Sequence, residues 1–85
     1  MDTITFNIIK HLGVVSKRVD PNGEERIKEV NLVSWNHKEP VIDIREWDED
    51  HNIAGRGLML NSAEAEKLER ILFFDRMHRT HDREE

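Results

Sequence analysis

The chain has 85 residues, a length that fits one small domain. A domain of this size buries only about 60–65% of the surface that its unfolded chain exposes, so pairing with a second copy would stabilise it considerably. Charged and apolar residues each make up 36% of the sequence, which is polar for a globular domain but not typical of a disordered one. Cysteine is absent, which excludes a disulfide framework and a thiolate metal site.

No apolar run approaches the ~20 residues needed to cross a bilayer, and the N-terminal stretch MDTITFNIIK lacks the basic segment of a signal peptide. We therefore expect a soluble, cytoplasmic protein, and association with the nucleoid stays open. The net charge of −5 argues against strong nonspecific binding to polyanions.

Alternating apolar and polar residues predict an antiparallel sheet in the first two thirds of the chain. The expected strands span residues 3–18, 25–36, 40–48 and 56–60. Gly13 permits a bend in the first strand, and the DPNG sequence at residues 20–23 predicts a tight hairpin turn. The pattern of the first strand would place Ile4, Phe6, Ile8, Leu12 and Val14 on the core side, with His11 and Lys17 on the other side.

The sequence after residue 60 predicts one helix, over residues 62–79. Asn61 and Glu64 have the spacing of a capping box at its start, and apolar residues then recur at helical spacing. The predicted fold is α+β, with four antiparallel strands followed by one C-terminal helix. We expect this helix to lie across the sheet face that carries Ile42 and Ile44.

The predicted helix carries more apolar surface than one contact with a sheet requires, since ILFF at residues 71–74 spans more than a full turn. One interpretation is a thick helix–sheet core with a single exposed phenylalanine. The other, which we favour for so small a domain, is a symmetric dimer formed through the helix. The dimer interface would then contain Leu68, Ile71, Phe73, Phe74 and Met77.

The third strand, VIDIREW at residues 41–47, indicates a function for the second face of the sheet. Its isoleucines face the core, so Arg45 and Trp47 lie on the opposite, open face, which Trp35 shares from the preceding strand. Aromatic rings on an exposed sheet can stack on unpaired bases while basic side chains hold the phosphates. The pattern therefore favours a surface for single-stranded nucleic acid.

A structural alternative explains the same residues. Trp47 can fold into the core, and Arg45 can pair with Asp43 or Glu46. Taken one by one, these residues fit the alternative better, whereas the two tryptophans on one predicted face favour a binding surface.

Two stretches, VSWNHKEPVIDIREW and AGRGLMLNSAEAEKLERIL, resemble the single-stranded-DNA-binding domain of the transcriptional coactivator positive cofactor four. They are more similar to its bacterial YdbC-like branch. The similarity covers about the whole chain and is strongest from Val33 to Leu72. It implies a strongly curved four-stranded sheet, a C-terminal helix that pairs into a two-fold dimer, and a groove that binds single-stranded DNA with little sequence preference.

Position by position, the resemblance implies that Arg45 and Arg56 contact the nucleic-acid backbone and that Trp35 and Trp47 supply aromatic surface. Asp48 stands where eukaryotic members have a further tryptophan, so that contact is not expected here. The expected nucleic-acid-binding residues are Lys17, Trp35, Lys38, Arg45, Trp47 and Arg56. The expected partners are single-stranded DNA, with RNA as a second option, and transcription or repair proteins.

The acidic balance has to be reconciled with this function. Residues up to Leu60 include eleven acids and eight bases, but a local field can be positive while the total charge is negative. We expect the acids of loop 48–50, of the helix and of the C-terminal tail to face away from the groove.

Other chemistry has little support in the sequence. Loop 48–52 lacks the glycine and the closing glutamate of an EF-hand, and nothing near His78 and His81 completes a metal site. We see no catalytic motif and expect a non-enzymatic protein without a cofactor. Two functions remain, namely a nucleic-acid-binding module in transcription regulation or DNA recombination and repair, and a protein-interaction dimer of the same fold with little DNA affinity.

Overall fold

The computed structural model describes residues 4–52 and 54–82. Its elements are strands β1 (Phe6–Val19), β2 (Glu25–Trp35), β3 (Val41–Trp47) and β4 (Ala54–Leu60) and helix α1 (Ser62–Asp82). All neighbouring strands are antiparallel, and the sheet order is β1-β2-β3-β4. This confirms the predicted α+β fold of four antiparallel strands followed by one C-terminal helix.

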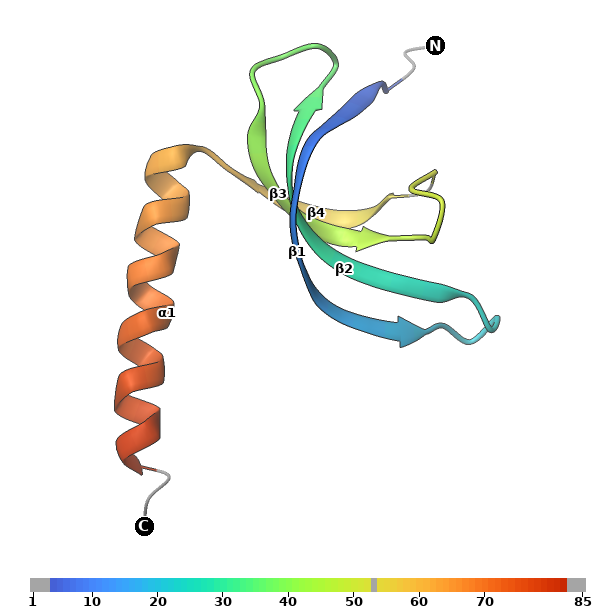
Figure 1. Cartoon of the computed structure of the whole chain (residues 1–85). Helices are drawn as coiled ribbons and strands as arrows, with labels where there is room; N and C mark the ends of the chain where they lie inside the picture. Colours follow the sequence, from blue (N-terminus) through green and yellow to red (C-terminus); the bar gives the residue numbers. More distant parts are fainter. Residues whose placement is uncertain (1–3, 53, 83–85) are drawn as a thin grey trace.

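The sheet is strongly curved, and the curvature has a local cause in β1. The pairing of β1 with β2 shifts register three times, and each shift leaves one extra residue on β1 (Ile9, Leu12 and Val15). Such bulges bend a strand and increase its twist. Figure 1 shows the strands bowed in one direction, with α1 on the convex side. The bend predicted near Gly13 is therefore one of three.

The bulges also reassign the faces of β1, which corrects one prediction. Phe6 pairs with Trp35 and Ile8 with Val33, so both lie on the tryptophan-bearing face and not on the helix side. His11, which the alternation already placed on the tryptophan-bearing face, pairs with Asn31 there. A period-two count fails wherever an extra residue interrupts the strand.

The β1–β2 turn has the chemistry that the sequence predicts, and the β2–β3 turn is similarly tight. In the first, Gly23 adopts a left-handed φ of 84°, and the Asp20 carboxylate accepts hydrogen bonds from two backbone amides of the turn. In the second, Asn36 and His37 are both left-handed, with φ of 51° and 63°, as in a two-residue hairpin turn. Because this second turn is tight, Lys38 lies next to Trp35, the last residue of β2.

The core of the sheet lies on its concave side. Val33 and Trp47 are fully buried there, and so are the side chains of Asn31 and Asp43. In the described part of the chain α1 touches only β3 and β4, so no second layer covers this face. The curl of the sheet itself therefore provides the burial.

Helix α1 begins as predicted but does not lie where we expected. The Glu64 amide donates to the Asn61 side chain at 2.8 Å, and the Asn61 amide donates to the Glu64 carboxylate at 2.9 Å, which completes the capping box. The prediction that α1 lies across Ile42 and Ile44 is wrong, because α1 stands away from the sheet over most of its length (Figure 1).

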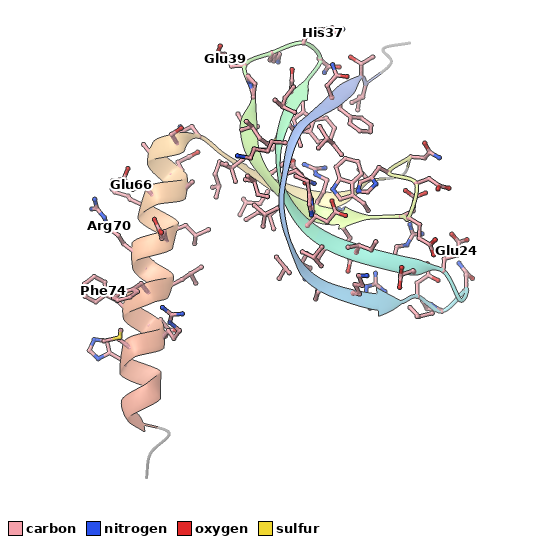
Figure 2. The ribbon with its side chains drawn as sticks, viewed as in Figure 1. Glu24, His37, Glu39, Glu66, Arg70 and Phe74 are labelled. Carbon is pink, nitrogen blue, oxygen red and sulfur yellow. The ribbon has the colours of Figure 1, made fainter. Side chains whose placement is uncertain are left out.

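The position of α1 leaves two apolar surfaces uncovered. On the helix, Ile71, Leu72, Phe73, Phe74 and Met77 are all exposed, and Figure 2 shows Phe74 pointing away from the sheet. On the convex side, Leu58 is 52% exposed. The chain exposes 7043 Å², whereas a compact chain of this length is expected to expose about 5,300 Å². No helix in residues 4–52 and 54–82 is long and apolar enough to span a membrane.

Replacing Asn61 with alanine removes the acceptor of the Glu64 amide. We expect the free energy of unfolding to fall by about 0.5–2 kcal/mol, the usual cost of losing an N-cap. Urea denaturation followed by helical circular dichroism measures this change. Asn7→Ala, at an exposed site in β1, is the control, and equal midpoints for the two variants would contradict the role of the cap.

Candidate functional site

The concave face is the candidate site, and its residues follow from the strand register. Asn31 pairs with Asp43, Glu29 with Arg45, and Ile27 with Trp47, so alternate residues of β2 and β3 share this face. The structure thus places Asp43, Arg45 and Trp47 opposite Ile42 and Ile44, in agreement with the sequence pattern.

An aromatic cluster fills the centre of the concave face. The Trp47 ring lies 5.1 Å from the Phe6 ring, 6.4 Å from the Trp35 ring and 5.4 Å from the His51 ring, measured between centroids. Trp47 is fully buried by these neighbours, whereas Trp35 is only half-buried. A base cannot stack on Trp47 in this conformation, which matches the structural alternative for that residue. Trp35 remains accessible.

Arg45 is held by several partners at once. Its Nε and one terminal nitrogen donate to the two oxygens of Asp43, both at 2.7 Å, and its other terminal nitrogen donates to the Gly55 carbonyl at 3.1 Å. The guanidinium carbon also lies 4.5 Å from the centre of the Trp35 ring. Its side chain is only 12% exposed, and that of Asp43 is fully buried. The alternative pairing of Arg45 with Asp43 is therefore present.

Gly57 makes room for this arginine. It lies directly across from Arg45 in the register of β3 and β4. A β-carbon built on Gly57 would come within 2.5 Å of the Arg45 Cβ and 2.7 Å of its Nε and Cζ. The Arg45 side chain therefore lies flat over the glycine, in space that any other residue would occupy.

A chain of polar groups, with Glu29 and Asn31 buried and two histidines partly exposed, crosses the same face beside the aromatic cluster. His11 Nδ1 lies 2.7 Å from the Asn31 side-chain oxygen, and the Asn31 amide donates to Glu29 at 3.0 Å. His51 Nε2 lies 3.0 Å from both Glu29 oxygens. His51 has a left-handed φ of 59°, so the β3–β4 loop is held in a sparsely populated conformation by this contact.

The ionisation of Glu29 reflects these neighbours. Burial by itself raises the pKa of the Glu29 carboxyl, but hydrogen bonds from Asn31 and His51 and the charge of the two histidines outweigh it. The pKa of Glu29 therefore lies below its ordinary value. The Glu29 carboxylate anchors the β3–β4 loop to β2 at every pH at which it is ionised.

A hollow of about 390 Å³ opens at the Trp35 end of the concave face. Trp35, Val41 and Met59 provide an apolar lining, and Lys38 and Arg45 add two basic groups. The full lining is Ile4, Trp35, Asn36, Lys38, Glu39, Val41, Arg45 and Met59. An apolar hollow with a few convergent polar groups is the usual form of a ligand site.

The opposite end of the sheet is acidic. A second hollow there, of about 260 Å³, is lined by Gly23, Glu24, Glu25, Asp48, Glu49 and Asp50. Lys17 is exposed on the concave face near this end, because it pairs with Ile27, which in turn pairs with Trp47. The electrostatic potential along the face therefore changes from positive near Lys38 to negative near the β1–β2 turn.

Arg56 does not join the other predicted site residues. It lies in β4 where the register with β3 shifts, and it lines a hollow with Lys28, Ile44, Glu46 and Leu58 on the convex side. The structure thus brings Lys17, Trp35, Lys38, Arg45 and Trp47 to one face and leaves Arg56 on the other. The predicted dimer residues Ile71, Phe73, Phe74 and Met77 are exposed, and Leu68 is half-buried.

Sequence reasoning missed three contributors to this face, namely Phe6, Glu29 and His51. Phe6 was assigned to the wrong side because of the bulges, and Glu29 and His51 meet only in the folded sheet. The described residues include no group of three or more acidic or histidine side chains placed to hold a metal ion, and the side chain of His81 lies outside them.

The chain matches no model of a known protein family and no curated protein. The resemblance to the positive cofactor four family therefore remains an expectation from the sequence.

Replacing Glu29 with glutamine keeps the shape of the side chain but removes its charge. We expect a loss of about 1–3 kcal/mol in the free energy of unfolding at neutral pH, because buried donors lose a charged acceptor. Since the pKa of Glu29 is lowered on folding, its stabilisation is complete above 4.5 and is lost as the pH falls through the lower, folded value. The gap between wild type and variant should therefore close on acidification.

Urea denaturation at a fixed protein concentration and at several pH values measures that gap. Glu49→Gln, at an exposed site in the β3–β4 loop that Glu29 contacts, is the control and should lie close to wild type throughout. A gap of constant size down to strongly acidic pH would contradict the assignment.

Proposed function

We propose that this protein is a non-enzymatic, cytoplasmic single-stranded-DNA-binding protein of low sequence specificity that acts as a symmetric dimer. The observation that carries the proposal is the hollow on the concave face, where the partly buried Trp35 and Lys38 line the same wall. Transcription regulation and DNA recombination or repair are the processes in which such binding would serve. The sequence resemblance supports the same function.

The hollow fits an unpaired base better than a duplex. The partly exposed ring of Trp35 would stack on one base, and such stacking contributes about 1–3 kcal/mol per base. Duplex bases are already stacked on one another and cannot open onto the ring. Lys38, next to Trp35 across the tight turn, is placed to hold the adjoining phosphate.

Charge explains where on the face a strand would bind. The acids at the β1–β2 turn and the β3–β4 loop repel phosphates, so we expect the strand to cross the Lys38 end. Few basic residues are in reach, and binding should therefore depend on stacking more than on phosphate contacts. A shallow dependence on salt follows.

The dimer is supported by the surface that one chain leaves uncovered. The excess over a compact monomer is about 1,700 Å², which is similar to the area that each partner buries in a stable homodimer. The occupant we propose is a second copy, because the exposed apolar residues of α1 and Leu58 on the convex face together offer a surface that can pair with itself.

The alternative function is a protein-interaction dimer with little DNA affinity. Two observations favour it, namely the complete burial of Trp47 and the pairing of Arg45 with Asp43. With these residues occupied, the acidic end of the face suits a basic polypeptide better than a nucleic acid.

Fluorescence anisotropy with a labelled ~20-nucleotide oligo(dT) tests the first function. We expect wild type to bind the single strand and not a matched duplex, and Trp35→Ala to weaken binding by about 1–3 kcal/mol. Absence of single-strand binding even at low salt would contradict the proposed function and favour the protein-interaction dimer.

Two lysines provide a matched control. Lys38 lines the hollow on the concave face, whereas Lys28 lies on the convex side. If Lys38 contacts one phosphate, Lys38→Ala should make the log–log salt slope shallower by about 0.7, and Lys28→Ala should leave it unchanged.

Sedimentation at micromolar concentration tests the dimer. We expect wild type to sediment as a dimer and Phe74→Glu to sediment as a monomer, because a charge would enter the buried apolar interface. Glu24→Lys, at the tip of a hairpin far from α1 (Figure 2), should leave the dimer intact. A monomeric wild type would rule out this arrangement.

A further inference from the structure

Two basic residues, Lys38 and Arg45, line the hollow. Most of the hydrogen-bond donors of Arg45 are already bonded to other groups of the protein. Asp43 and the Gly55 carbonyl take three of its N–H groups, out of the five that a guanidinium offers. Its guanidinium carbon lies 4.5 Å from the centre of the Trp35 ring, and its side chain lies over Gly57. Contacts surround the guanidinium on several sides.

Moving this guanidinium to a phosphate would have a clear cost. Asp43 is fully buried, and its two oxygens are both occupied by Arg45. A swing of Arg45 toward the ligand would leave that carboxylate buried without its partner, which is strongly unfavourable. The ion pair also cancels most of the positive charge that a phosphate would sense at this position.

We infer that Arg45 is a positioning residue, which holds the Trp35 ring as the stacking wall of the hollow, and that Gly57 is required to seat it. This inference rests on the proposed function and refines it, because the resemblance implies a backbone-contacting role for Arg45. Lys38, and not Arg45, is then the phosphate contact at this end of the face.

The geometry explains why all three residues belong together. Gly57 lets the arginine side chain lie against β4, Asp43 fixes the plane of the guanidinium through a bidentate contact, and that plane restricts the Trp35 ring. A ring held in advance loses less entropy when a base stacks on it. Displacing Arg45 should therefore weaken base stacking without changing the number of phosphates contacted.

Gly57→Ala tests the inference without altering any charge. The new methyl group would collide with Arg45 and displace it. We expect the affinity for oligo(dT) to fall about tenfold at every salt concentration, with the log–log salt slope unchanged. A slope that becomes shallower by about 0.7 would mean that a phosphate contact had been lost, which would overturn the inference.

Gly55→Ala, on the same strand, is the matched control. Its added methyl group would make only ordinary contacts with Glu46, at 3.5 and 3.7 Å, and the carbonyl that Arg45 contacts is kept. We expect its affinity and slope to equal those of wild type. Comparison at a temperature where circular dichroism shows all variants folded separates positioning from loss of stability.

A second measurement does not depend on DNA binding. In protein labelled with 5-fluorotryptophan, the fluorine resonance of Trp35, assigned with Trp35→Phe, should shift or broaden in Gly57→Ala, and that of Trp47 should not. An unchanged Trp35 resonance would overturn the positioning role. If wild type binds no single strand but the resonance does shift, the positioning role stands and only the proposed function fails.

Discussion

A single curved sheet has to bury one of its faces without a second layer, and the rest of the structure depends on this constraint. Helix α1 stands apart from the sheet, so the described strands have only their own curl to shield them from water. Three bulges in β1 supply the curl. As a result the concave face encloses Val33 and Trp47 completely in a very short chain.

The enclosed face is polar as well as aromatic, and this limits what it can bind. Asp43 and Glu29 are buried carboxylates that hold Arg45 and His51 in place. Buried pairs of this kind contribute little net stability, because desolvation offsets much of their attraction. Their main effect is geometric, since they fix a guanidinium against one indole ring and a loop against another. The accessible part of the face is thereby reduced to its Trp35 end.

Local chemistry made the elements predictable, whereas long-range geometry did not. The DPNG turn and the capping box at Asn61 depend on neighbouring residues alone, so the sequence reveals both. The face occupied by Phe6 depends on bulges that a regular alternation cannot show. The position of α1 was mispredicted for a different reason, because a helix whose apolar residues do not gather in one stripe does not reveal which surface it will cover. Pattern placed Arg45 on the correct face, but only the fold shows how it is bonded.

The spacing of the bulges also constrains how β1 can change length. The extra residues of β1 are Ile9, Leu12 and Val15, which recur at every third position. None of them has a partner in β2. Deleting one of them would restore strict alternation at that point and straighten the strand. The side chains on both flanks of the deletion would keep their present faces, because each would still lie opposite the same partner in β2. Loss of one residue at a bulge would therefore reduce the curvature of β1 without changing which of its side chains lie on the concave face.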